Sequence, residues 1–226
     1  MDEKTVKQII REELQKLSKL TWKQRFVYVW DYYKPLFAAI IGILALISLG
    51  VTIYQNKQLN HLLHIYFMNC NSMEVNSEEI TDEFVESIGG IGEKDVISID
   101  TTMAFIGDDS EYEMANQMKL MAMSAAAEMD LIVVDEEKYL ELEAQGFFGD
   151  LTEVLSEEQM EKWSDLLVEG TALEDGTIPV TGIDLTDSPV LEKAHAYPGL
   201  KVYGAVAVSS THTDLCDDFI TYLMGE

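Results

Sequence analysis

Four histidines are the side chains of this 226-residue chain best suited to act as a base or to hold a transition metal. None of them stands in a metal-binding pattern such as HExxH, and no GxSxG segment provides a nucleophilic serine. Residues 209–212 (SSTH) contain a hydroxyl and an imidazole, but they follow a strand pattern and precede a helix pattern, which is typical of a loop. We therefore predict no catalytic residue. The four histidines are His61, His64, His195 and His212.

Metal and cofactor sites are not indicated either. The two cysteines, Cys70 and Cys216, belong to no CxxC motif and no Cys/His cluster, so we expect two separate buried thiols, with a disulfide as the alternative. The acidic run at 108–111 lacks the spacing of an EF-hand, and carboxylates at a helix start suit the helix dipole without a metal. The glycine-rich segment 89–92 lacks a P-loop lysine. We expect no metal ion and no cofactor.

The charge is distributed unevenly along the chain. Residues 1–57 contain nine of the 15 basic residues and only five of the 41 acidic ones. Residues 58–226 consequently carry a formal charge of −30 and contain no arginine. Such a charge excludes nucleic-acid binding, because phosphates require lysine and arginine, and it disfavours contact with an anionic lipid surface. The interpretations of this charge that remain are a solvated acidic surface and association with cations or a basic partner.

Residues 36–54 (LFAAIIGILALISLGVTIY) form an apolar run without any charge. As a helix these residues would span about 28 Å, close to the hydrocarbon thickness of a bilayer. Eight basic residues precede the run and only Lys57 follows it closely, so the positive-inside rule places the N-terminus in the cytoplasm. No A-x-A-like cleavage site follows, which predicts an uncleaved signal-anchor. The predicted parts are a cytoplasmic amphipathic helix (1–35), a transmembrane helix (36–56) and an extracellular domain (58–226).

The segment before the anchor is rich in aromatic residues and contains basic ones. Rings with polar edges favour the headgroup zone, and the interleaved basic residues favour anionic lipid. The pattern is similar to the start of many uncharacterised bacterial single-pass proteins, a resemblance that implies an architecture but no activity. A docking helix for a cytoplasmic partner is the alternative. The predicted membrane-interface residues are Trp22, Phe26, Trp30, Tyr33 and Lys34.

Strand and helix patterns alternate through the rest of the chain. They predict an α/β fold with a mainly parallel sheet and helices on both faces. Ligands dock at the carboxyl edge of such sheets, so the candidate ligand-binding residues are those in the loops that follow the strands. These candidates are Asn69, Asn71, Thr101, Thr102, Asp135 and Ser209. We expect strands at 62–69, 95–103, 130–135 and 201–209, an extended segment at 176–185, and helices at 77–88, 111–128, 136–145, 156–168, 187–195 and 213–224.

The helix pattern at 111–128 is unusually rich in methionine. Met114, Met118, Met121 and Ala125 share one face of this helix. Our main interpretation is a core helix in which flexible side chains fill gaps. The alternative is an adaptable surface for a peptide or a partner helix.

Residues 127–155 (AEMDLIVVDEEKYLELEAQGFFGDLTEVL) resemble extracellular solute-binding proteins of the type II periplasmic-binding fold. In that family a strand such as Asp130–Val134 is followed by a helix, a Gly-aromatic turn and Asp-Leu-Thr. The closing residues 202–225 are similar to the family's return strand and helix. The resemblance covers most of residues 62–226 and implies one lobe of such a protein, because no room remains for the second lobe that would close over a ligand. The matching turn residues are Gly146, Phe147, Phe148, Asp150, Leu151 and Thr152.

These observations predict a single-pass cell-membrane protein with a cytoplasmic N-terminus and an extracellular C-terminus. We expect the outer domain to bind a solute, a peptide or a partner protein without catalysis. The alternative is a structural or assembly subunit of a membrane complex that uses the lobe as a protein-interaction surface. An empty polar pocket over the loops that follow the strands would favour the binding module, whereas an exposed apolar patch rimmed with charge would favour the structural or assembly subunit.

Overall fold

The computed structural model describes residues 21–56, 59–105, 110–173 and 175–226. The chain divides into two units, Met1–Gln58 and Leu59–Glu226, which are described separately. Most of the amphipathic pattern in the predicted cytoplasmic helix falls in residues 1–20, outside the described residues. A search of the described part of the chain finds no helix with both the length and the hydropathy required of a membrane span.

The first unit contains one long helix, α2 (Trp22–Asn56). Its side chains from residue 37 to residue 52 are exposed, and all of them are uncharged. Trp22, Trp30 and Lys34 are also exposed. The side chains of Phe26 and Tyr33 lie outside the part that the structure describes.

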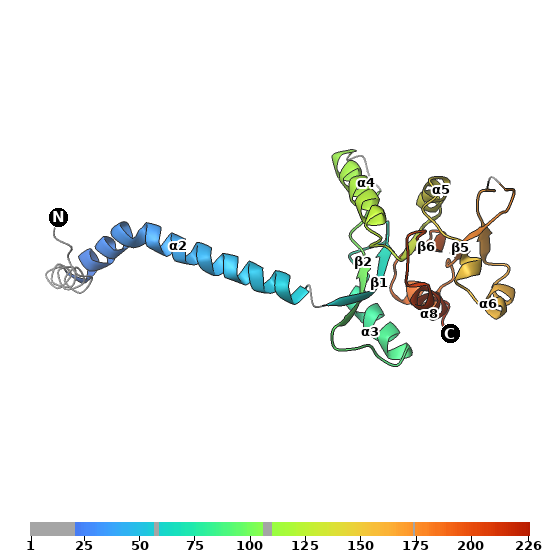
Figure 1. Ribbon diagram of the computed structural model, residues 1–226, viewed down its shortest axis with the longest axis horizontal. Helices are drawn as coiled ribbons and strands as arrows, with labels where there is room; N and C mark the ends of the chain where they lie inside the picture. Colours follow the sequence, from blue (N-terminus) through green and yellow to red (C-terminus); the bar gives the residue numbers. More distant parts are fainter. Residues whose placement is uncertain (1–20, 57–58, 106–109, 174) are drawn as a thin grey trace. The chain divides into compact units, whose positions relative to one another are not determined.

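The second unit is built on a six-stranded sheet with the order β2-β1-β3-β6-β5-β4 (Figure 1). Strand β1 pairs in parallel with β2 and β3. Strand β6 runs antiparallel to both β3 and β5, and β4 runs antiparallel to β5. The sheet is therefore mixed, and the prediction of a mainly parallel sheet is wrong. The strands are β1 (Asn60–Phe67), β2 (Asp95–Asp100), β3 (Leu131–Asp135), β4 (Leu167–Glu169), β5 (Val180–Asp184) and β6 (Val202–Val206).

The connections between the last three strands fit their antiparallel pairings with one another. Strands β4 and β5 are joined by a hairpin loop in which Gly176 has a φ of 85°, a conformation that glycine adopts without steric cost. Strand β5 is followed by the five-residue helix α7 (Pro189–Lys193), after which β6 begins at the edge where β5 ends. The hydrogen bond from Leu185 N to Val202 O, 2.8 Å long, shows that the two strand ends are adjacent. A parallel pairing would need a crossover to the opposite edge.

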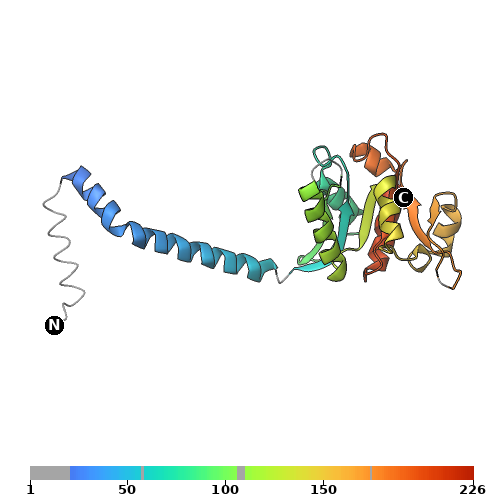
Figure 2. The ribbon, with the colours of Figure 1, turned by 90° about the horizontal axis from the view of Figure 1, so that it is seen from above.

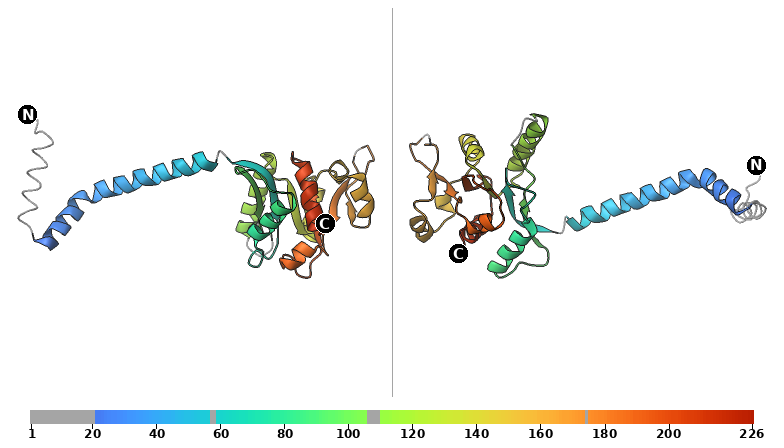
Figure 3. Two further views of the ribbon diagram at one scale, coloured as in Figure 1. Left: turned by 90° about the horizontal axis from the view of Figure 1, so that it is seen from below. Right: turned by 180° about the vertical axis from the view of Figure 1, so that it is seen from behind.

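Helices cover both faces of the sheet. Helices α4 (Ser110–Ala125) and α5 (Glu136–Ala144) lie over one face, as Figure 2 shows. Helices α3 (Ser77–Ser87) and α8 (Thr213–Leu223) lie over the other face, as the view from below in Figure 3 shows. The segment expected as one helix at 156–168 instead contains α6 (Glu157–Lys162), the buried Trp163 and the start of edge strand β4. A short 3-10 helix, η1 (Leu151–Glu153), precedes α6.

The alternation of side chains along β1 divides the core into two layers. Leu63, Ile65 and Phe67 belong to a buried cluster with α3, α7 and α8, whereas Tyr66 and Met68 belong to a cluster with α4 and α5. The first layer is closed by an edge-to-face pair of rings from α3 and α8, with centroids 4.8 Å apart. Helix α4 contributes few buried side chains to the second layer.

Candidate functional site

The predicted ligand-binding edge is the carboxyl edge of the sheet at β1, which lies between β2 on one side and β3 on the other. In doubly wound sheets a ligand crevice opens at such a point. Here Asn69, which follows β1 and is only 9% exposed, spans the gap to β3. Its Nδ2 donates a hydrogen bond to Asp135 Oδ2 (2.5 Å), and its Oδ1 accepts one from Phe105 N (2.6 Å). The amide of Asn69 is therefore used to join three loops.

A tyrosine from the loop after α7 closes the same point from the other face. The hydroxyl of Tyr197 lies 3.0 Å from the carbonyl oxygen of Met68 and 2.7 Å from that of Val133. Burial raises the pKa of Tyr197 well above its usual value. The carbonyl ends of β1 and β3 thus find a partner within the protein.

The remaining predicted residues at this edge shape turns. Thr102 donates from both its backbone N and its Oγ1 to Asp100 Oδ1, at 2.7 and 2.6 Å. The carbonyl of Thr101 accepts a long contact from Cys70 Sγ (3.7 Å). Asn71 bonds through its backbone, with its N–H 2.8 Å from the carbonyl of Ala196. The structure therefore brings Asn69, Asn71, Thr101, Thr102 and Asp135 to one edge, but the polar contacts that it records for them serve the fold.

Ser209 lies at the opposite edge of the sheet, so the expectation that it lies with the other five candidates is wrong. Strand β6 runs antiparallel to β3, so the loop that follows β6 meets the start of β3 and not its end. The Ser209 hydroxyl is buried and has no hydrogen-bond partner among the described residues. The sequence shows where a strand ends but not in which direction the strand runs in the sheet.

A buried carboxylate at this opposite edge was missed by the sequence reasoning. Asp130 is 1% exposed and precedes β3 directly. Its Oδ2 accepts from His64 N (2.8 Å), and its Oδ1 accepts from Ser210 Oγ (2.6 Å). His212 Nδ1 lies 3.0 Å from the same Oδ1. The sequence signal that could have identified this carboxylate is an aspartate directly before an apolar strand.

This cluster has the residue types of a hydrolase triad without its connectivity. Acyl transfer requires a serine that gives its proton to a histidine, which an acid then orients. Ser210 donates to Asp130 and also lies 3.8 Å from Cys216 Sγ. The described contacts thus make Asp130 the anchor of the loop that leads into α8.

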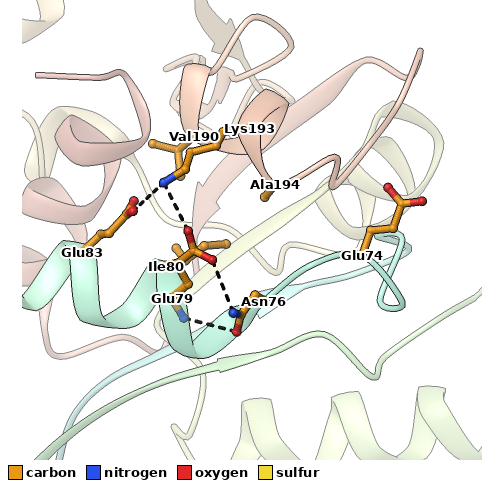
Figure 4. A pocket seen from close by; sticks show the side chains of 8 residues that line it. All are labelled: Glu74, Asn76, Glu79, Ile80, Glu83, Val190, Lys193 and Ala194. Carbon is orange, nitrogen blue, oxygen red and sulfur yellow. Dashed lines mark hydrogen bonds and ion pairs between the residues drawn. The ribbon is translucent and has the colours of Figure 1, made fainter.

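Two depressions also lie on the described surface. A hollow of about 580 Å³ beside α7 has a buried apolar floor and an exposed charged rim, and its Lys201 is paired with Glu136 at 3.1 Å. A smaller cleft of about 90 Å³ between α3 and α7 has room for only a few water molecules (Figure 4). In this cleft Lys193 contacts Glu79 at 3.4 Å and Glu83 at 2.5 Å, and its hydrogen bond lowers the pKa of Glu83. The cleft therefore fastens two helices.

Helix α4 presents a broad apolar surface to solvent. Among its described side chains only Asn116 and Leu120 are buried. Met114, Met118 and Met121 are 60%, 66% and 55% exposed, and Ala125 is also exposed. We call these four residues the methionine face. The interpretation of this face as part of the core is wrong, because the opposite side of α4, with Leu120, packs against the sheet.

Polar contacts supplement this limited burial of α4. Asn116 Nδ2 donates to the carbonyl of Ala104 (2.5 Å), and Lys119 Nζ lies 3.0 Å from Asp100 Oδ2. These contacts hold the helix in place with its methionine face outward.

The second unit is thus an α/β domain with a closed carboxyl edge and an exposed apolar helix face. No family description, no curated protein and no solved structure matches the chain.

Replacement of Asn69 by alanine tests the structural role of the carboxyl edge. The variant Asn69→Ala loses two buried side-chain hydrogen bonds and places alanine at a φ of 57°. We expect the free energy of unfolding, measured with urea, to fall by about 2–4 kcal/mol. Asn71→Ala is the matched control and should change it by less than about 0.5 kcal/mol. Equal effects of the two variants would contradict this role.

The dependence of stability on pH tests the environment of His64. Burial, followed by the neighbouring His61, lowers the pKa of His64, while Asp130 and Glu128 act in the opposite direction and His212 acts with His61. As the pH falls, the unfolded chain therefore binds a proton at the His64 imidazole before the folded chain does. The free energy of unfolding consequently decreases below about pH 6.5.

Replacement of His64 should remove this part of the pH dependence. We expect His64→Gln to lose less stability than the unaltered protein between about pH 7.5 and about pH 5.5 in urea titrations. His195→Asn is the control variant. His195 is exposed and has a left-handed backbone conformation, which asparagine tolerates. This variant should therefore behave like the unaltered protein. A profile of His64→Gln that coincides with that of the unaltered protein would refute the assignment.

Proposed function

We propose that this protein is a membrane-anchored extracellular binding module that recognises a partner protein or peptide through the methionine face of α4, without catalysis. The single observation that carries this proposal is the exposure of three large apolar side chains along one helix of an otherwise acidic domain. Contiguous apolar surface of this kind marks interaction sites in soluble domains. Methionine side chains adapt their shape to a partner, which suits a recognition surface.

The carboxyl edge of the sheet supports a surface partner over an enclosed solute. A small ligand needs most of its surface buried and a few free polar groups. The amide of Asn69, the carboxylate of Asp135 and the hydroxyl of Tyr197 are each engaged by other groups of the domain. The resemblance to one lobe of a solute-binding protein stays a prediction.

The proposed tether is the apolar run at 36–54. The uncharged, exposed residues 37–52 of α2 surround the helix on every side, and a lipid environment would remove this surface from water. In this proposal residues 1–35 lie in the cytoplasm and 58–226 lie outside the cell, in the order that the basic residues favour. The aromatic residues before the anchor then contact the lipid interface, and the bilayer is the second partner of the chain.

Labelling of placed cysteines tests the topology. Met73→Cys, at a position that is 97% exposed, should react in intact cells with a thiol reagent that does not cross membranes. Burial raises the pKa of Cys70 to about 11 and that of Cys216 to about 12, so the native thiols react slowly near neutral pH. Thr5→Cys is the control and should react only after permeabilisation. Labelling of Thr5→Cys in intact cells would reverse the proposed orientation.

Photocrosslinking tests the binding surface. A photoreactive phenylalanine analogue at Met118 should give a discrete crosslinked product in the membranes of the native host, because this side chain points into the proposed interface. The same analogue at Met73, an exposed methionine outside α4, should not give this product. Identical products from both positions, or none from position 118, would argue against the methionine face as the binding surface.

A further inference from the structure

We infer that the partner of the methionine face is an amphipathic helix that carries lysine or arginine beside its apolar residues. This inference rests on the proposed function and adds the chemistry of the partner. It follows from the charge of the domain and from the spacing of the methionines.

The domain has almost no cations to offer a partner. Residues 58–226 contain 36 acidic residues and six lysines. At least five of these lysines contact carboxylates of the domain itself, and the excess of acidic over basic residues gives the domain its negative charge. The five pairs are Lys119 with Asp100, Lys138 with Glu141, Lys162 with Glu226, Lys193 with Glu83, and Lys201 with Glu136.

The methionine face has the geometry of a helix seam. Its members follow one another at steps of four, three and four residues, the spacing at which one helix packs along another. The face extends over about 16 Å of the helix axis, which is about three turns. The small Ala125 within it allows a partner helix to approach closely at that end. A helix with apolar residues at the same spacing would therefore cover the whole face.

The surroundings of the face select the charge of the partner. The exposed carboxylates of Glu113 and Glu128 lie near the two ends of α4. A second copy of this domain would bring another formal charge of −30, which opposes association, and an anionic lipid surface is repelled in the same way. A basic helix gains attraction from the same carboxylates and is steered toward the domain.

Designed peptides test this inference on the full chain in nanodiscs of zwitterionic lipid. The probes are a helical peptide of leucine and lysine in heptad spacing, the same peptide with glutamate for lysine, and a lysine–serine peptide without leucine. Binding is measured by fluorescence anisotropy, with empty nanodiscs subtracted. The variants are Met118→Gln on the face and Met73→Gln as the matched exposed control; both keep the charge of the chain.

We expect the leucine–lysine peptide to bind most tightly, with Met118→Gln weakening it about tenfold and Met73→Gln leaving it unchanged. The lysine–serine peptide should bind more weakly and respond to neither substitution, because it reports only the general charge. Equal affinities of the leucine–lysine peptide for the two variants would overturn the inference.

Two other outcomes separate this inference from the proposed function. If the glutamate peptide binds as tightly as the lysine peptide and Met118→Gln weakens it, the methionine face binds helices but the inferred charge of the partner is wrong. If sedimentation shows that the chain self-associates and that Met118→Gln abolishes this, the occupant is a second copy. In both cases the binding function survives while the basic-helix partner is rejected.

Discussion

Strand β6 lies between β3 and β5 and runs against both of them. All five of its residues are buried, and among the described strands it supplies the only pairing that joins those from the first part of the domain to those from the second. Gly204 lies in its centre, and a Cβ there would lie 2.7 Å from a methyl carbon of Leu185, so the Leu185 side chain would have to shift. The single mixed sheet therefore depends on this tightly packed antiparallel strand.

The direction of β6 also decides the chemistry of both edges of the sheet. At one edge the chain between β5 and β6 brings Tyr197 beneath the ends of β1 and β3, where Asn69 bonds to Asp135. At the other edge the chain after β6 delivers Ser210 and His212 to the buried Asp130. These polar side chains are thereby engaged within the fold, which supports the proposal that the methionine face of α4 is a binding surface.

Some features of the site followed from the sequence and others did not. Asn69 and Asp135 are expected at the carboxyl edge of the sheet, and they meet there because the adjacent parallel strands β1 and β3 end at the same edge. Ser209 was expected beside them but lies at the opposite edge, because residue patterns identify a strand without giving its direction. The methionines share a face, as periodicity predicted, yet that face points outward, since periodicity does not say which side of a helix the sheet will cover.

The sequence by itself determined the alternation of strands and helices, the shared face of the methionines and the charge of residues 58–226, because these depend on local spacing and composition. It also defined the uncharged run of residues 36–54. Only the tertiary structure decided that the sheet is mixed, that Asn69 and Tyr197 close its carboxyl edge, and that Asp130 anchors the start of α8. These features depend on contacts between residues that are far apart in the chain, which form only when β6 inserts between β3 and β5.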